Sequence, residues 1–141
     1  MADLQDIRWK QRFSNFSKAF TLYEKIVLQI RNNKKAGRIS SDIEKMALIQ
    51  AFEMIFELSW KTLKDYLESE GFVDLASPRR VIKQAFESAY LKNGELWILA
   101  LVDRNLSAHI YEEKISKITQ RIEEQYFELF LDLKQMFENI S

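Results

Sequence analysis

The segment RNLSAHIY, residues 104–111, holds the only histidine of this 141-residue chain. Because the chain has no cysteine, His109 is the side chain best suited to ordinary proton transfer near neutral pH. Arg104 can hold a phosphate through its planar set of N–H donors, and Tyr111 offers a hydroxyl that can be modified. Together these residue types favour phosphodiester chemistry.

The spacing of Arg104 and His109 constrains how they could act together. In a regular helix each residue turns by about 100°, so two side chains five positions apart point about 140° away from each other. Either the chain leaves helical geometry around residues 107–108, or the arginine of one subunit meets the histidine of another across a two-fold interface. A plainer alternative is that His109 only caps or packs, while Arg104 pairs with a neighbouring carboxylate.

A second group of polar residues borders the apolar side of a predicted helix. Its members follow one another at spacings of three, four and four: Gln50, Glu53, Glu57 and Lys61. They could line a cleft, or they could form a solvated row with a pair between Glu57 and Lys61. Two nearby carboxylates also suit a divalent cation, but nothing else in the sequence indicates one. We therefore expect no metal and no cofactor.

A third candidate is a cluster of basic residues at a predicted helix start. Ser77-Pro78 is a strong start signal, and Arg79, Arg80 and Lys83 follow it. An anion could bind at this helix N-terminus, although solvated charge is the simpler interpretation.

The composition favours one helical domain over residues 1–141. Apolar residues make up 47% of the chain and aromatic residues 13%, which is enough side-chain volume for a packed core. Only three glycines and one proline occur, which leaves few breaks for a many-stranded fold. Lysine plus arginine and aspartate plus glutamate both number 21, so no global field would attract RNA and any RNA contact must be local.

The sequence shows neither a signal peptide nor a membrane span. Its start, MADLQDIRWKQRF, lacks the apolar core of a signal peptide, and no apolar run approaches the ~20 residues that a span needs. The absence of cysteine fits a reducing interior. We therefore expect a cytoplasmic protein that does not enter the membrane.

Apolar residues recur at spacings of three and four, which predicts five amphipathic helices. We expect them at roughly 6–33, 42–70, 78–92, from about 95 to Arg104, and from about 111 towards the C-terminus. Ser41 and Glu44 form a capping box before the second helix, and Gly71 is a natural terminator after it. Helices joined by short turns indicate an all-α, up-and-down antiparallel bundle of four to five helices.

Two of the predicted helices carry apolar residues on a wider face than a single stripe. Ile55 and Leu58 widen the second helix, and Phe127, Phe130 and Leu131 widen the last one. This width favours a partner surface, and we expect a homodimer. The alternative is that a short chain covers its own core from several angles.

Four stretches carry a resemblance that spans nearly the whole chain. They are RWKQRFSNFSKAF (8–20), IQAFEMIFELSWKTLKDYLESEGF (49–72), SPRRVIKQAFESAY (77–90) and GELWILALVDRNLSAHIYEE (94–113). In this order they resemble the nucleotidyltransferase substrate-binding protein family, the HEPN-fold partner of prokaryotic minimal nucleotidyltransferases. The resemblance implies a dimerising helical bundle with a site of arginine and histidine near the dimer interface.

The resemblance also implies roles for single residues. Family members with the order Arg, four residues, His, one residue, Tyr resemble toxins of HEPN and minimal nucleotidyltransferase toxin-antitoxin pairs, which act as metal-independent ribonucleases. Arg104, His109 and Tyr111 match this order, and Asn105 matches its common Arg-Asn form. His109 would transfer protons, Arg104 would stabilise phosphate charge, and Asn105 would orient the imidazole or bind phosphate.

In such pairs the nucleotidyltransferase antitoxin transfers AMP from ATP to the motif tyrosine, here Tyr111, and this silences cleavage of the RNA substrate. The older family name leaves a second function open, in which the chain is a non-catalytic subunit that presents a substrate or nucleotide to the nucleotidyltransferase. A helical dimer whose only role is assembly is a third.

Overall fold

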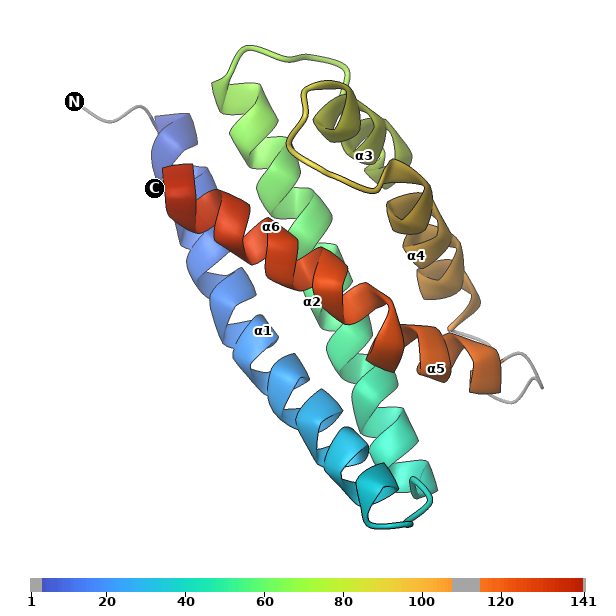
Figure 1. Ribbon diagram of the computed structural model, residues 1–141. Helices are drawn as coiled ribbons and strands as arrows, with labels where there is room; N and C mark the ends of the chain where they lie inside the picture. The colour runs from blue at the N-terminus through green and yellow to red at the C-terminus, as the bar shows by residue number, and fades with distance from the viewer. Residues whose placement is uncertain (1–3, 108–114, 141) are drawn as a thin grey trace.

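The computed structural model describes residues 4–107 and 115–140, which form six α-helices and no strand (Figure 1). The helices are α1 (Leu4–Lys35), α2 (Asp42–Ser69), α3 (Pro78–Glu87), α4 (Gly94–Leu106), α5 (Ile115–Glu124) and α6 (Tyr126–Ile140). The predicted all-α bundle is therefore confirmed. Over these residues, no helix combines the length and the apolar character needed to cross a membrane.

Helix α2 is the central element of the bundle. It runs beside α1 as the second arm of an antiparallel hairpin, α6 crosses both helices, and α3 and α4 lie on the other side of α2 (Figure 1). Every other helix contacts α2. A side chain on α2 can therefore meet groups from several distant parts of the chain.

Aromatic rings from four helices form the middle of the core. The rings of Phe52 and Tyr126 stack with centroids 5.5 Å apart, and Phe130 meets Tyr23 at 5.5 Å and Trp97 at 5.4 Å, edge to face. All five side chains are at most 1% exposed. These offset and edge-to-face arrangements are the favourable ones for aromatic pairs, so the rings fix α1, α2, α4 and α6 relative to one another.

The additional apolar side chains of the second and last predicted helices pack within the core of the single chain. Ile55 and Phe130 are fully buried and Phe127 is nearly so, while Leu58 and Leu131 pack against the core. These side chains do not form an exposed partner surface, because α2 and α6 each contact several other helices at once. The homodimer stays a prediction, and it needs a different face.

Most helix ends follow the predicted signals. Ser41 and Glu44 form the capping box, and the Ser77 hydroxyl accepts from the backbone N–H of Arg80. Gly37 and Gly71 follow α1 and α2 with φ of 78° and 98°, a region that glycine adopts without steric cost. Helix α3 ends at Glu87, earlier than the expected residue near 92.

The early end of α3 has a clear geometric cause. The N–H of Ala89 donates to the carbonyl of Phe86, and the N–H of Tyr90 donates to the carbonyl of Ala85. This pair of bonds closes the helix as a Schellman motif, with Ala89 at φ 63° in the place that glycine usually takes. An alanine in this position gives no stop signal in the sequence.

The expectation of one continuous last helix is wrong, because α5 and α6 are separated at Gln125. In a continuous helix the carbonyls of Ile122 and Glu123 would accept from the backbone four residues later. Side chains of α1 contact these two carbonyls instead: the Tyr23 hydroxyl donates to Ile122 at 2.5 Å, and Arg31 donates to Glu123 at 2.6 Å. Donors from α1 thus cap the end of α5. The start of this helical region near residue 111 lies outside the described residues.

Candidate functional site

Arg104 lies in the last turn of α4 and reaches across to α2. Its Nη1 donates to Oε2 of Glu53 at 3.1 Å, and the two side chains are 31% and 29% exposed. Charge-assisted hydrogen bonds of this kind are stronger than neutral ones and fix the orientation of the guanidinium. The structure therefore brings together two predicted site residues that are 51 positions apart in the sequence.

Helix α4 ends directly after Arg104, at Leu106, and the buried Ser107 is its C-cap residue. The Ser107 hydroxyl lies 3.1 Å from Oε2 of Glu53 and 2.8 Å from the carbonyl oxygen of Arg104, so its single proton can be donated to either. Ser107 still has right-handed helical dihedral angles, with φ −64° and ψ −15°, so the departure from helical geometry around residues 107–108 stays a prediction. Ala108, the other half of that expectation, lies outside the described residues.

The guanidinium of Arg104 keeps donors that Glu53 does not use. Arginine has five N–H donors, and Glu53 takes one of them. The Nε atom is buried and has no hydrogen-bond partner within the part of the chain that the structure describes. An arginine held at one donor and incompletely satisfied at the others is suited to bind an anion.

Glu57 lies one turn of α2 beyond Glu53 and is influenced by the same arginine. Burial alone would raise its pKa, but hydrogen bonds from Trp60 and Lys61, together with the charges of Lys61 and Arg104, lower the pKa below its usual value. The Trp60 bond is 3.1 Å long and the Lys61 contact 3.2 Å. Glu57 is therefore a carboxylate with its own partners, and the predicted pair with Lys61 is present.

The structure separates two other predicted residues from this contact. Gln50 is exposed and lines a shallow apolar groove of about 290 Å³ between α1 and α2, together with Leu22 and Met54. Asn105 is exposed on α4. Only Glu53, of the predicted cleft residues, touches Arg104 directly.

His109 and Tyr111 lie outside the described residues, so their predicted roles remain predictions. The basic residues at the start of α3 show no sign of a built anion site. Arg79 and Lys83 are exposed, and Nη1 of Arg80 donates to the carbonyl of Asp74 at 3.4 Å. Solvated charge is the interpretation that these contacts support.

A buried cluster that was not among the predicted site residues supports the end of α4. Asp103 is 1% exposed and accepts from Nε of Arg121 at 2.7 Å, from Nη2 of Arg121 at 2.8 Å, and from the hydroxyl of Tyr126. Hydrogen bonding to Asp103 is the main reason why the pKa of Arg121 is raised. An acidic residue inside the apolar run LWILALVDRNL was the available signal, but its partners follow 18 and 23 residues later.

Over residues 4–107 and 115–140, no group of three or more histidine, aspartate and glutamate side chains is arranged to hold a metal ion. The carboxylates near Arg104 are engaged with cations and hydrogen-bond donors of the chain instead.

Comparison with known families gives one match for the chain. A family described as nucleotidyltransferase substrate binding protein like matches residues 11–139. The chain belongs to this family. The nucleotidyltransferase substrate-binding match includes residues of all six helices and the whole segment 104–111, and the resemblance inferred from the sequence is confirmed. The family name indicates a protein that binds a substrate for a nucleotidyltransferase and so acts with such an enzyme. No curated protein matches the chain.

Proposed function

We propose that this protein is a HEPN toxin-like, metal-independent endoribonuclease of a toxin-antitoxin pair, silenced by AMP transfer to Tyr111 from a partner minimal nucleotidyltransferase. The observation that carries the proposal is the position of Arg104. Glu53 holds it at the end of α4, with N–H donors left over for a phosphate. Five positions later the sequence places its only histidine, and Tyr111 completes the order Arg, His, Tyr.

RNA cleavage needs groups that these residue types supply. The 2′-hydroxyl of the RNA attacks the adjacent phosphorus while a base takes its proton, and the bond from phosphorus to the 5′-oxygen breaks as an acid protonates that oxygen. His109 serves the proton transfers, and two subunits of a homodimer would supply one imidazole as base and one as acid. Arg104 stabilises the charge on the crowded phosphate, and Asn105 orients the imidazole or binds phosphate.

Silencing by AMP follows from the same charges. The hydroxyl oxygen of Tyr111 attacks the α-phosphorus of ATP and gives its proton to a base of the nucleotidyltransferase. A bond from oxygen to that phosphorus forms, and pyrophosphate leaves. The attached AMP brings a phosphate anion into the sequence neighbourhood of Arg104, where it competes with the RNA for the remaining donors.

RNA cleavage by the purified protein tests the assignment. We expect cleavage by the unaltered chain and a loss of roughly 100-fold or more in His109→Ala and Arg104→Ala, because general acid–base catalysis and charge stabilisation each contribute about that much. Arg79→Ala, an exposed arginine on α3, is the matched control and should cleave normally. Equal cleavage by all four proteins would remove the assignment.

The family match favours one other function, a non-catalytic subunit that presents a substrate to the nucleotidyltransferase. This alternative predicts nucleotide transfer that depends on the partner enzyme and no ribonuclease activity. Incubation with the nucleotidyltransferase and ATP, followed by mass spectrometry of the unaltered chain and of Tyr111→Phe, locates the acceptor. Transfer to Tyr111 supports the AMP step, and undiminished transfer to Tyr111→Phe contradicts it.

A further inference from the structure

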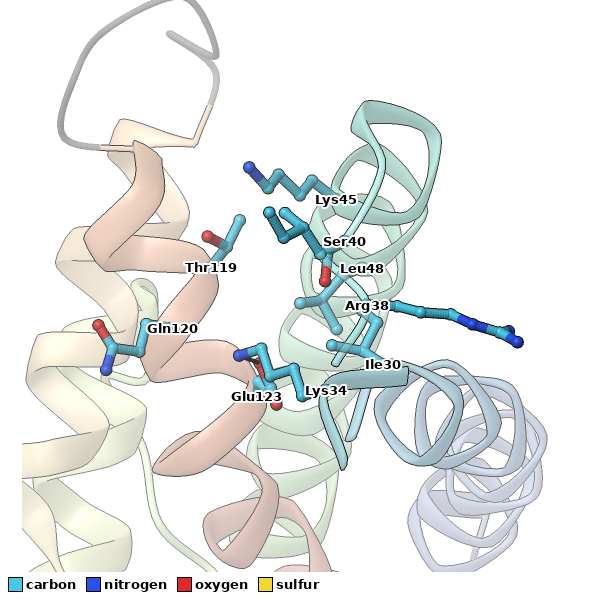
Figure 2. A pocket seen from close by; sticks show the side chains of 10 residues that line it. Ile30, Lys34, Arg38, Ser40, Lys45, Leu48, Thr119, Gln120 and Glu123 are labelled. Carbon is cyan, nitrogen blue, oxygen red and sulfur yellow. Dashed lines mark hydrogen bonds and ion pairs between the residues drawn. The ribbon is translucent and has the colours of Figure 1, made fainter. Parts of the chain in front are cut away.

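A pocket distinct from the Arg104 contact lies where α1 ends, α2 begins and α5 passes them (Figure 2). Its volume is about 320 Å³, which suits a compact ligand. Lys45 at its edge lies eight residues before Glu53 on α2, a separation of about 12 Å along the helix. The pocket is therefore a near neighbour of the candidate site without sharing its residues.

The walls of this pocket are held in place by contacts between α1 and α5. Nζ of Lys34 lies 2.6 Å from Oε2 of Glu123, and Nη2 of Arg31 donates to the carbonyl oxygen of Glu123 at 2.6 Å. Glu123 is only 5% exposed, and one of its carboxylate oxygens, Oε2, is paired with Lys34. A ligand entering here would meet a preformed shape.

The charge around the pocket favours an anion. Its lining contains three cations, Lys34, Arg38 and Lys45, against the single carboxylate of Glu123. Figure 2 shows the amine of Lys45 reaching from α2 across the opening towards α5, whereas the guanidinium of Arg38 points away. Neither Lys45 nor Arg38 has a carboxylate partner among the described residues.

A cation is a poor occupant, because one carboxylate already paired with a lysine would have to hold it beside two further positive charges. The lining also includes apolar side chains. Ile30 and Leu48 are buried at its base, and Ile39 is 91% exposed beside it. The exposed side chain of Ile39 therefore offers an apolar surface against which a flat part of a ligand can pack.

We propose that this pocket binds a nucleoside phosphate, with the phosphate at Lys45 and the base against the aliphatic side chains. Glu123 would bind the ribose, because a carboxylate with one oxygen paired to Lys34 can still accept hydrogen bonds from ribose hydroxyls. The ligand is either a free nucleotide or the phosphorylated end of an RNA, since both present the same chemistry.

Calorimetric titration of the full chain with AMP, adenosine and a 5′-phosphorylated RNA dinucleotide tests the proposal. We expect saturable AMP binding that weakens as salt rises, with adenosine bound roughly tenfold more weakly because it lacks the charged group. Lys45→Ala should lose roughly tenfold in AMP affinity and Lys45→Arg should retain it, since a single phosphate contact accounts for about that difference. Lys25→Ala, an exposed lysine on α1, is the matched control.

Three results would overturn the proposal: no saturable AMP binding, equal binding of adenosine and AMP, or unchanged binding in Lys45→Ala. Tighter binding of the dinucleotide than of AMP, with the same loss in Lys45→Ala, would identify an RNA end as the ligand, and weaker binding would identify a free nucleotide. The inference goes beyond the proposed ribonuclease, because AMP binding is measured without RNA cleavage and either can fail alone.

Discussion

At the scale of single residues, the contact between Glu53 and Arg104 sets what the arginine can do. The carboxylate orients the guanidinium but also occupies a donor that a phosphate could use. Because both side chains are about one-third exposed, the pair itself contributes only about 1 kcal/mol to folding. Its importance therefore lies in positioning, and we call Glu53 a positioning residue.

Glu53→Ala should lower kcat/KM for RNA cleavage by roughly tenfold, because an arginine without its partner samples several rotamers and loses preorganisation. Glu53→Gln should restore most of the rate, since its amide oxygen still accepts from Arg104. Steady-state cleavage of a labelled RNA measures both. Arg79→Ala, on the exposed surface of α3, is the control, and faster cleavage by Glu53→Ala would show instead that Glu53 inhibits the arginine.

How much of the site the sequence could predict depends on the distance between its parts. The sequence alone reveals the order Arg104, His109, Tyr111, because the three residues lie within eight consecutive positions. Glu53 was named as a possible cleft residue, but its partner was not, because a contact over 51 positions depends on how α2 and α4 pack. Periodicity indicates which face of a helix is polar, and it does not indicate what that face meets.

At the scale of helices, the same division between local and long-range information explains the fold. Capping at Ser41 and Ser77 and termination at Gly71 are local, and the sequence predicted these helix ends. The break between α5 and α6 was missed, because the groups that produce it, Tyr23 and Arg31, come from α1. Because these donors belong to another helix, the sequence around the break contains no signal for it.

The cluster of Asp103, Arg121 and Tyr126 joins the end of α4 to α5 and α6. Asp103→Ala should lower the free energy of unfolding by about 3–5 kcal/mol, because it removes the buried partner of a charged group. Tyr126→Phe should cost only about 1–2 kcal/mol, the cost of one hydrogen bond. Urea denaturation followed by circular dichroism measures both, with the exposed Val102→Ala as control. A loss below about 1 kcal/mol in Asp103→Ala would show that the cluster is dispensable.

At the scale of the whole molecule, the predicted homodimer needs a surface, and Phe127 and Phe130 cannot supply it. The groove between α1 and α2 is a better candidate, because Leu22 and Met54 on its rim are 50% and 55% exposed. Exposed apolar side chains around a groove are typical of partner surfaces.

We expect a dimer by analytical ultracentrifugation. The double variant Leu22→Glu with Met54→Glu should raise the dissociation constant by roughly tenfold or more, because dimerisation would bury two like charges from each subunit. Val73→Glu changes a side chain that is 77% exposed in the loop before α3, and it should leave the dimer intact. A monomeric unaltered protein would contradict the dimer, and an equal effect of Val73→Glu would contradict this choice of surface.

The stability of the molecule at high pH depends on its buried tyrosines. Burial raises the pKa of Tyr23, Tyr66 and Tyr126 above the ordinary value of 10.0, with hydrogen bonding to Asp103 adding to the shift at Tyr126. A raised pKa means that the folded chain holds these protons more tightly than the unfolded chain. The free energy of unfolding should therefore be insensitive to these groups below about pH 10 and fall as the pH rises further.

Tyr23→Phe tests this dependence on a single ring. At neutral pH it should cost about 1 kcal/mol, because the hydroxyl no longer donates to the carbonyl of Ile122. Above pH 10 its unfolding free energy should fall less steeply than that of the unaltered chain, by up to about 1.4 kcal/mol per pH unit, since one fewer proton is released on unfolding. Urea denaturation at several values of alkaline pH measures the two slopes, and lysine titration cancels in their difference. Parallel curves above pH 10 would show that the Tyr23 hydroxyl titrates alike in both states.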